Sequence, residues 1–248
     1  MESAISINDL CIGYKEKDNI KTVCNLLNAS LPEGSLTCLI GVNGSGKSTL
    51  LRTLAGFLPP VSGNAYIHGS DIKKMTYHQK AKAIGIVLTE KPDIQHFSAR
   101  EIVSLGRSPY TGFFDKLTDE DNRIIDDSIN KIGINDIKDR LVDTLSDGER
   151  QKVMIAKVLA QQTPIILLDE PTAFLDYPSK IEVLELLREM AHDMGKTIIL
   201  STHDLGTSLN KVDQIWLMTK NKELKTGRPD DFKLGLTMTS EQIINLFK

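Results

Sequence analysis

The stretch Gly41–Thr49 constrains this chain more than any other part, and it reads Gly-Val-Asn-Gly-Ser-Gly-Lys-Ser-Thr. It has the spacing of a phosphate-binding P-loop, in which two glycines separated by four residues precede a lysine and a serine or threonine. The run Ser35–Ile40 before it predicts a buried strand, and Ser48–Ala55 after it predicts a helix. The backbone N–H groups of such a loop can form a nest for an anion beside the positive end of the helix dipole. The sequence therefore predicts a nucleotide-binding site between a strand and a helix.

Side chains of the P-loop have separate expected roles. Lys47 is expected to reach the β- and γ-phosphates, and the hydroxyl of Ser48 is expected to ligate Mg²⁺. The other residues of this loop expected to contact the nucleotide are Asn43, Gly44, Gly46 and Thr49. The alternative is a glycine-rich turn with this spacing by chance, which we expect in on the order of 1 in 100 chains of this length. The strand before the loop and the helix after it count against that alternative.

Two acids follow a second apolar run and form the next part of the expected site. Ile165–Leu168 predicts a strand buried on both faces, and Asp169 and Glu170 come directly after it. Ligands bind at the carboxyl ends of the strands in open α/β sheets. We expect Asp169 to support Mg²⁺ through water and Glu170 to polarise a water in line with the γ-phosphate. Acids at a strand end can also merely cap a following helix, but a P-loop upstream favours the catalytic interpretation.

Length and patterning indicate one domain. The chain has 248 residues, of which 40% are hydrophobic, and this suits a single α/β domain over residues 1–248. Residues 91–144 contain no strong strand pattern and predict short helices at Ala99–Leu105, Asp119–Lys131 and Asn135–Lys138. We therefore expect a helical subdomain inserted at 91–144.

The rest of the chain predicts a mixture of strands and helices. Near the amino terminus we expect an exposed-edge strand at Ala4–Leu10, a turn at Cys11–Lys17 and a second strand at Lys21–Leu27. Further strands are expected at Asn64–His68, Ile84–Leu88, Thr197–Ser201 and Gln214–Met218, and helices at Met75–Ala83, Asp147–Gln161, Ser179–Met194 and Ser240–Lys248. This pattern predicts an antiparallel β-rich opening followed by an α/β core.

Charge and cysteine content exclude several classes of partner. A net charge of −3 gives no reason to expect nucleic acid or an anionic membrane surface as a direct partner. Cys11, Cys24 and Cys38 are widely spaced, so structural disulfides and zinc are not expected and a reducing cytosol is the simpler compartment. No signal peptide is evident, and no apolar run approaches the roughly 20 residues that span a bilayer. Work at a membrane would therefore require another chain to hold this protein there.

The sequence Leu145-Ser-Asp-Gly-Glu149 is similar to a short signature of a known protein family. With the P-loop, Ile165–Glu170, Asp176 and His203, it resembles the nucleotide-binding subunits of ABC transporters, whose signature is Leu-Ser-Gly-Gly-Gln. The chain departs from that signature at two positions, Asp147 and Glu149, and keeps Ser146 and Gly148. The resemblance implies a P-loop ABC ATPase fold of class α/β, with a mixed parallel sheet core, an antiparallel β subdomain and a helical insertion. A serine at a helix N-cap with amides directed at an anion agrees with this, although Ser-Asp-Gly is also a common capping turn.

The resemblance assigns a role to each matching residue. In the family, the signature closes over the ATP of a second protomer, so it implies a head-to-tail homodimer with two ATP molecules and Mg²⁺ in the interface. Ser146 and Gly148 match the positions used on the γ-phosphate, and Asp176 matches the loop that lines this interface. His203 matches the switch histidine that contacts the γ-phosphate and orients the catalytic carboxylate or the water. Tyr14 matches the aromatic residue that stacks on adenine.

One position departs from the family pattern without a clear replacement. The family has a glutamine after the strand that corresponds to Ile84–Leu88, where it touches Mg²⁺ and couples to the membrane subunit. This chain has Thr89 there, followed by Glu90, and Gln95 lies six residues further on. The sequence assigns no role to any of the three.

The run Ser104–Tyr110 (Ser-Leu-Gly-Arg-Ser-Pro-Tyr) resembles importer ATPases for iron-siderophore complexes, haem and cobalamin. That branch implies membrane permease subunits, an extracytoplasmic binding protein and a peripheral location at the cytoplasmic face of the cell membrane. The alternatives are that Gly-Arg-Ser-Pro is only a polar loop, and that the chain is an exporter subunit or a soluble ABC-type ATPase. A small-molecule P-loop kinase would lack both Leu-Ser-x-Gly and the histidine at position 203.

Overall fold

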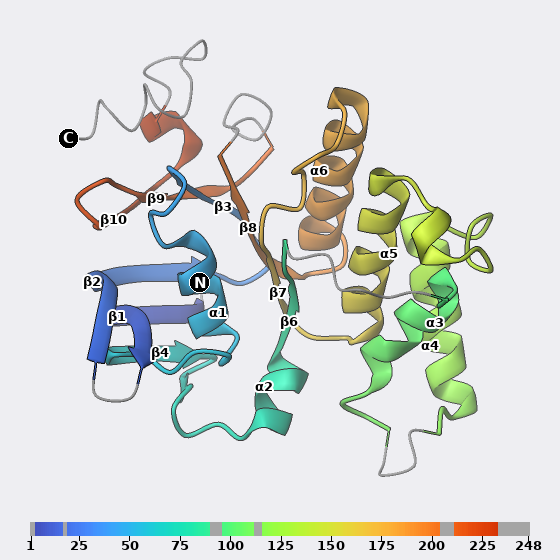
Figure 1. Ribbon diagram of the computed structural model, residues 1–248, viewed down its shortest axis with the longest axis horizontal. Coiled ribbons are helices and arrows are strands. Elements are labelled where there is room, and N and C mark those ends of the chain that lie inside the picture. The colour runs from blue at the N-terminus through green and yellow to red at the C-terminus, as the bar shows by residue number, and fades with distance from the viewer. Residues whose placement is uncertain (1–2, 17–18, 90–95, 112–115, 204–210, 233–248) are drawn as a thin grey trace.

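The computed structural model describes residues 3–16, 19–89, 96–111, 116–203 and 211–232, and it contains two sheets (Figure 1). The larger sheet has the strand order β10-β9-β3-β8-β7-β6, and the smaller has the order β2-β1-β4-β5. The strands of the larger sheet are β3 (Leu36–Gly41), β6 (Ile84–Val87), β7 (Ile165–Leu168), β8 (Thr197–Thr202), β9 (Gln214–Met218) and β10 (Leu224–Gly227). Those of the smaller sheet are β1 (Ser3–Glu16), β2 (Asn19–Pro32), β4 (Ser62–Ile67) and β5 (Ser70–Asp71).

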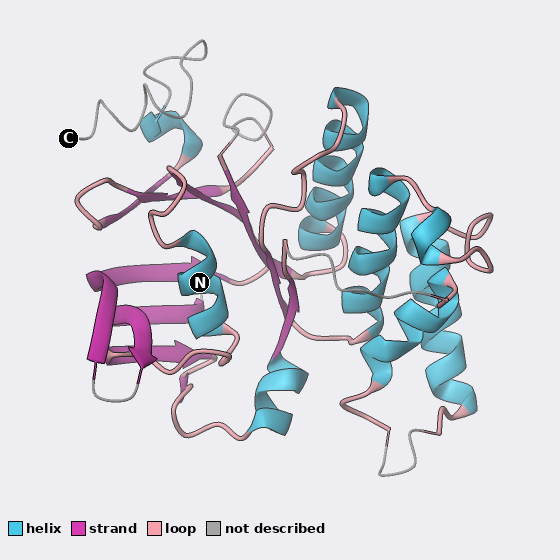
Figure 2. Ribbon diagram, viewed as in Figure 1, coloured by secondary structure: helices cyan, strands magenta, loops and turns pink. Residues whose placement is uncertain are grey.

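Helices lie on both faces of the larger sheet, and Figure 2 shows them in cyan around the magenta strands. They are α1 (Lys47–Leu54), α2 (Tyr77–Ala83), α3 (Ala99–Ser104), α4 (Asp119–Ile132), α5 (Asp147–Ala160) and α6 (Tyr177–His192), with 3₁₀ turns η1 (Leu105–Arg107), η2 (Val142–Thr144) and η3 (Pro229–Phe232). In Figure 1, α1 and the smaller sheet lie on one side of the larger sheet, and α3 to α6 lie on the other. The expected α/β architecture with an antiparallel β portion is therefore confirmed.

The alternation of side chains along buried strands produces two hydrophobic cores. In β3, Cys38 packs toward α5 and α6, whereas Leu39 packs toward α1 and the smaller sheet. Leu200 and Ile199 of β8 divide in the same way. Successive residues of a strand point to opposite faces, so a sheet covered on both sides needs an uninterrupted apolar run. This explains why β7 reads Ile-Ile-Leu-Leu and is fully buried.

The topology of the larger sheet places three chain segments at one edge. Strand β8 pairs in parallel with both β3 and β7, so these three strands are adjacent and end on the same side of the sheet. The P-loop follows β3, the acidic pair follows β7, and His203 follows β8. Parallel pairing therefore brings together residues that are more than 120 positions apart in the sequence.

The amino-terminal predictions were wrong in two respects. Ala4–Leu10 is not an edge strand, because β1 lies between β2 and β4 and its apolar residues are buried. Cys11–Lys17 is not a turn as far as it is described, because β1 continues to Glu16. Register shifts in the pairing with β2 and a positive φ of 47° at Asp9 interrupt the two-residue alternation, so the sequence pattern ends before the strand does.

The remaining predicted elements agree with the structure within a few residues, with two exceptions. Asn135–Lys138 forms a turn rather than a helix. The helix expected at Ser240–Lys248 lies outside the described residues. Strands β5 and β10 had no clear sequence signal. Every helix in the described ranges is too short or too polar to cross a membrane.

Candidate functional site

The P-loop connects β3 to α1 in a conformation that requires glycine. Gly46 caps α1 with a left-handed φ of 109°, and Gly44 also has a positive φ of 80°. A Cβ atom added at Gly46 would lie 2.8 Å from Cγ1 of Val23 and 3.1 Å from Sγ of Cys24. Residues with side chains rarely adopt such φ values, and here they would also collide with the smaller sheet. The loop predicted from glycine spacing is therefore built as an open turn that leads into a helix N-terminus.

The thiol of Cys24, on strand β2, contacts the backbone of the P-loop. It donates a hydrogen bond to the backbone oxygen of Ser45 at 3.2 Å. Burial raises the pKa of Cys24 to about 11, so the group remains a protonated donor at neutral pH. The sequence analysis gave Cys24 no role, because strand β2 and the P-loop are not neighbours in sequence.

Lys47 is buried at the edge of the sheet, with 5% of its surface exposed. Its ammonium group donates a hydrogen bond to the backbone oxygen of Gly41 at 2.9 Å. The same nitrogen lies 3.5 Å from Oε1 of Glu170, which completes an ion pair. An incoming phosphate group can replace both partners, since a lysine side chain is flexible and has three donors.

Glu170 lies between Lys47 and His203. Its second carboxylate oxygen, Oε2, is 3.0 Å from Nδ1 of His203. Its backbone N–H donates to Oγ of Ser201 at 2.9 Å, and its φ is +50°, which is uncommon for a residue other than glycine. Backbone strain of this kind concentrates at functional sites, where surrounding contacts hold the side chain in one direction. The expected pairing of Glu170 with His203 is thus present in the geometry.

Asp169 is 4% exposed and is held by the same serine. The hydroxyl of Ser201 donates to Oδ1 of Asp169 at 2.7 Å, while it accepts the N–H of Glu170. Ser201 therefore fixes both acids, and the sequence analysis missed this role. The available signal was a polar residue directly after the apolar run Ile198–Leu200 of β8, beside the strand that carries the acids.

The residues after β6 do not reproduce the family's glutamine. The hydroxyl of Thr89 donates to the backbone oxygen of Asp169 at 2.8 Å, which ties this loop to the acidic pair. Glu90 and Gln95 lie outside the described residues.

Tyr14 lies beside the helix that follows the P-loop. Its hydroxyl is within 3.1 Å of Oγ1 of Thr49, and the residue is 37% exposed. A half-exposed ring next to a phosphate-binding loop offers a face on which a base can stack.

Ser146 begins α5, as the sequence predicted. Its hydroxyl accepts the N–H of Glu149 at 3.2 Å, and Glu149 Oε2 accepts the N–H of Ser146 at 2.8 Å, which completes a capping box. These hydrogen bonds from Ser146 and the nearby charge of Arg140 lower the pKa of Glu149. Glu149 thus serves the cap as a glutamine would, which gives a structural reason why this departure from the signature is tolerated.

Gly148 and Asp176 lie close to Ser146 in the fold. Asp176 caps α6 by accepting the N–H of Ser179 at 3.1 Å, and the hydrogen bonds from Ser179 lower its pKa. A Cβ atom at Gly148 would lie 3.4 Å from Oγ of Ser179, so the first turns of α5 and α6 are neighbours. Within the part of the chain that the structure describes, no hydrogen bond or ion pair joins Ser146, Gly148 or Asp176 to the P-loop. One chain therefore presents two separate groups of candidate nucleotide-binding residues.

A P-loop at the carboxyl ends of parallel strands, with a buried Asp169, a partly buried Glu170 and a histidine beside it, defines a nucleoside triphosphatase fold and site. The family model for ABC transporters matches residues 24–173. The achromobactin transport ATP-binding protein of Dickeya dadantii is 37% identical over 228 residues, which is 92% of this chain and 83% of that protein. The iron(3+)-hydroxamate import ATP-binding protein of Bacillus subtilis is 36% identical over 225 residues, 91% of this chain and 82% of that protein.

Solved structures of ABC transporter proteins are also similar to this chain. A metal-chelate type ABC transporter in an inward-facing conformation has a TM-score of 0.80 and 28% identity, covering 99% of this chain and 89% of that chain. A dimeric ATP-binding cassette in a post-hydrolysis state with ADP and phosphate has a TM-score of 0.78 and 25% identity, covering 91% of this chain and 98% of that chain. The chain belongs to the ABC transporter family and is an ATP-binding, ATP-hydrolysing subunit of it.

Proposed function

We propose that two copies of this chain power the import of an iron-siderophore complex or a related metal chelate such as haem or cobalamin. Two observations support the cargo class: the curated relatives named for achromobactin and iron(3+)-hydroxamate transport, and the structural similarity to a metal-chelate type transporter. The run Ser104–Tyr110 first suggested the same branch.

The nucleotide site is proposed to hold ATP with Mg²⁺. The phosphates lie against the P-loop residues Asn43, Gly44, Gly46, Lys47, Ser48 and Thr49, and the adenine stacks on Tyr14. Mg²⁺ takes oxygen ligands, and the hydroxyl of Ser48 and the carboxylate of Asp169 supply that chemistry. Among the described residues, Asp169 accepts its side-chain hydrogen bond through Oδ1 from Ser201, which leaves Oδ2 for the metal or a water bound to it. The bound metal would neutralise phosphate charge.

Glu170 is proposed to be the general base for hydrolysis. The observation that carries the proposal is its carboxylate, which contacts the phosphate-binding Lys47 through Oε1 and His203 through Oε2. When Lys47 moves to the phosphates, Oε1 becomes available to accept a proton from a water in line with the γ-phosphate. His203 then keeps the carboxylate oriented through Oε2 and faces the γ-phosphate.

The second group of residues is proposed to close over the ATP of a partner copy. Ser146 and Gly148 present the amino-terminal end of α5, whose dipole favours an anion. Asp176 lies next to them and would line the same interface. The similarity to a dimeric cassette supports a head-to-tail dimer with ATP between the two copies.

The chain is proposed to form one ABC ATPase domain over residues 1–248, with residues 91–144 as a helical subdomain inserted in it. That subdomain docks a pair of membrane permease subunits at the cytoplasmic face of the cell membrane, and an extracytoplasmic binding protein delivers the chelate to the permease. The exporter and the soluble ABC-type ATPase remain the rival functions.

Uptake in cells tests the proposal. Cells that lack this chain are complemented with the wild-type chain or with Glu170→Gln, and uptake of a radiolabelled ferric siderophore, haem and cobalamin is measured. We expect the wild-type chain, but not the variant, to restore uptake of one of these compounds. Equal uptake of all three with and without the chain would contradict the importer assignment.

A further inference from the structure

The peptide unit that joins Asp169 to Glu170 is held at both ends by side-chain hydroxyl groups. Its oxygen, on Asp169, accepts a hydrogen bond from the hydroxyl of Thr89 at 2.8 Å. Its N–H, on Glu170, donates to the hydroxyl of Ser201 at 2.9 Å. Thr89 follows β6 and Ser201 belongs to β8, so the two hydroxyls come from the strands on either side of β7. Any rotation of this peptide unit therefore costs at least one hydrogen bond.

This restraint acts on the backbone angle that directs the side chain of Glu170. Rotation of the peptide unit changes φ of Glu170, which is +50° and lies in a region that residues other than glycine seldom occupy. Such a conformation persists only where surrounding contacts hold it. In this conformation Oε1 of Glu170 lies 3.5 Å from Nζ of Lys47, and Oε2 lies 3.0 Å from Nδ1 of His203. The two hydroxyls thus stabilise the backbone geometry that places the carboxylate beside the P-loop lysine.

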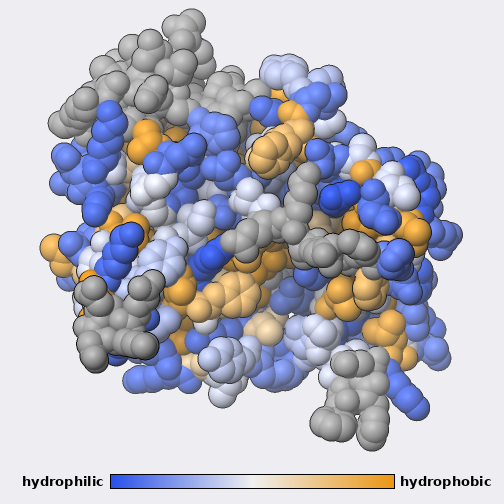
Figure 3. Space-filling model, in the orientation of Figure 1, coloured by the Kyte–Doolittle hydropathy of each residue, from blue (hydrophilic) through white to orange (hydrophobic). Residues whose placement is uncertain are grey.

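Strand β6 sets the direction in which the side chain of Thr89 points. The N–H of Asp169 donates to the backbone oxygen of Val87 at 2.8 Å, so the chain after β6 stays beside the acids. Ile86 and Leu88 line a groove of about 840 Å³ between α2 and α5. Figure 3 shows hydrophobic surface, in orange, in the middle of this face of the molecule. Because side chains of an extended chain alternate, Thr89 points away from the groove and toward the acids.

Thr89 stands where the family pattern has a glutamine that touches Mg²⁺. Its shorter side chain ends on the backbone of the neighbouring strand. Ser201 is fully buried, and its hydroxyl also donates to Oδ1 of Asp169 at 2.7 Å. The departure from the pattern at position 89 therefore adds a second restraint on the acids, opposite the one that Ser201 supplies.

We propose that Thr89 and Ser201 are positioning residues for ATP hydrolysis, which clamp the peptide unit between the two acids and so keep the carboxylate of Glu170 aimed at the attacking water. The inference rests on the proposed role of Glu170 as the general base. Neither hydroxyl exchanges a proton with the substrate, and both act through Glu170. Position 89 in this chain thus serves the hydrolytic step instead of binding the metal.

Steady-state ATP hydrolysis by the full-length chain tests the clamp. Thr89→Val keeps the shape of the side chain and removes the hydroxyl, so kcat should fall about fivefold, as the loss of one hydrogen bond gives. The KM for ATP should stay within about twofold of wild type, because the interaction lost serves the chemical step. Thr89→Ser keeps the hydroxyl and should restore kcat. Ser201→Ala should lower kcat by about tenfold or more, because this hydroxyl serves both acids.

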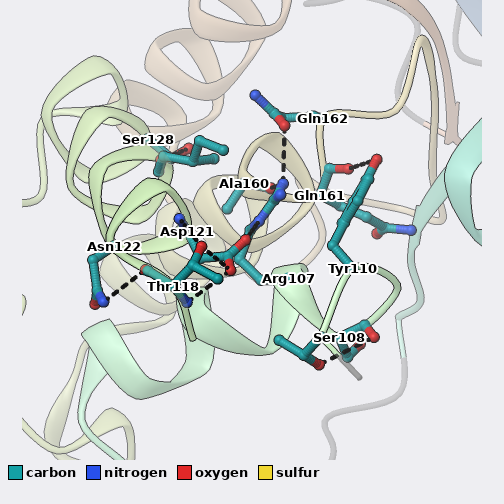
Figure 4. A network of polar contacts seen from close by, with 12 residues as sticks. Arg107, Ser108, Tyr110, Thr118, Asp121, Asn122, Ser128, Ala160, Gln161 and Gln162 are labelled. Carbon is teal, nitrogen blue, oxygen red and sulfur yellow. Dashed lines mark hydrogen bonds and ion pairs between the residues drawn. The ribbon is translucent and has the colours of Figure 1, made fainter. Parts of the chain in front are cut away.

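Ser128→Ala is the matched control. The hydroxyl of Ser128 donates to the backbone oxygen of Ile124 at 2.7 Å on α4, outside the nucleotide site (Figure 4). Its loss removes a similar hydrogen bond and should leave kcat and KM unchanged. Thermal unfolding is measured for every variant, and Thr89→Val should unfold at nearly the wild-type temperature because Thr89 is exposed.

A double-mutant cycle separates positioning from a general structural effect. In a Glu170→Gln background, Thr89→Val should not slow single-turnover hydrolysis further, since its effect passes through Glu170. ATP binding by Thr89→Val, measured by calorimetry with and without Mg²⁺, should match the wild-type chain.

An unchanged kcat in Thr89→Val, or an equal further fall in the Glu170→Gln background, would overturn the inference. Weaker binding of ATP by Thr89→Val only when Mg²⁺ is present would assign position 89 to the metal and would also overturn it. Wild-type turnover in Glu170→Gln alone would instead remove the proposed base, so the two failures are distinguishable.

Discussion

The ammonium nitrogen of Lys47 lies 3.5 Å from Oε1 of Glu170, although the two residues are 123 positions apart in the sequence. The contact joins the cation proposed to bind phosphate to the carboxylate proposed to activate water. The ammonium of Lys47 is engaged by Glu170 and by the backbone oxygen of Gly41, the two partners with which bound phosphates would compete. We therefore expect ATP binding to separate the pair and to free the carboxylate for its proposed base function.

Replacement of Glu170 by glutamine tests the base. Glu170→Gln keeps the size of the side chain but removes the proton acceptor, so hydrolysis should fall by about 10²–10⁴-fold. ATP binding should remain, and a dimer held by ATP should accumulate, because closure no longer leads to hydrolysis. Phosphate release and size-exclusion chromatography measure the two effects. Glu185→Gln, an exposed acid on α6 that pairs with Lys211, is the control and should change neither. An unchanged turnover rate in Glu170→Gln would remove this residue from the base role.

Removal of the lysine tests nucleotide binding. Lys47→Ala deletes the charge expected to contact the phosphates, so titration calorimetry should show no ATP binding at concentrations that saturate the wild-type chain. The variant also leaves Glu170 without its cation, so the thermal unfolding of the nucleotide-free chain is measured alongside. Lys131→Ala removes an exposed charge and should bind ATP normally. Retained affinity in a folded Lys47→Ala chain would contradict the assignment.

The local parts of the site could be predicted from sequence because each depends on a short pattern. The P-loop spacing, the acids after Ile165–Leu168 and the cap at Ser146 each lie within a few residues of one another. Parallel pairing then accounts for the meeting of the P-loop with Glu170 and His203, once β8 is known to lie between β3 and β7. Sequence order alone does not give that strand order.

Other features depend on packing and left little trace in the sequence. Nothing in the local sequence distinguishes Ser201 from other strand residues. Its role depends on the pairing of β8 with β7, which places the hydroxyl of Ser201 2.7 Å from Oδ1 of Asp169. Strand β1 extends beyond its apolar pattern, because bulges change which face each residue occupies. Lys157 reads as one charge on an amphipathic helix, and only the approach of Gly106 and α2 turns its side chain into part of a groove.

The two roles of Ser146 can be separated with a matched control. Ser146→Ala removes the N-cap of α5 and should lower stability by about 1 kcal/mol. Ser98→Ala removes an equivalent capping box at α3 and should lower stability by a similar amount. Only Ser146→Ala should also weaken the ATP-held dimer and slow hydrolysis, since α3 is not proposed to face the partner's nucleotide. Equal dimerisation and turnover in the two variants would leave Ser146 with a capping role alone.

The buried pair of Arg107 and Asp121 predicts a specific dependence of stability on pH. Hydrogen bonds from Thr118 and then the Arg107 guanidinium lower the pKa of Asp121 from 3.8 to about 2. Because the folded-state pKa is depressed, the ionised carboxylate stabilises the fold fully above about pH 4, and this contribution is lost as the pH falls toward 2. This pKa shift corresponds to a contribution of about 2 kcal/mol to the free energy of unfolding.

Urea unfolding of the wild-type chain and of Asp121→Asn, followed from pH 5 to pH 2, measures this contribution. At pH 5 the variant should be less stable by about 3 kcal/mol, because it leaves the Arg107 guanidinium buried without its counter-charge. The difference in the free energy of unfolding between wild type and variant should narrow by about 2 kcal/mol as Asp121 of the wild-type chain takes up its proton. Asp126→Asn is the matched control on the same helix, since Asp126 pairs with Arg100 but is 53% exposed. Its difference from wild type should stay within about 1 kcal/mol at every pH. If Asp121→Asn lowers the free energy of unfolding by the same amount at pH 5 and at pH 2, the charge of the Asp121 carboxylate does not stabilise the fold.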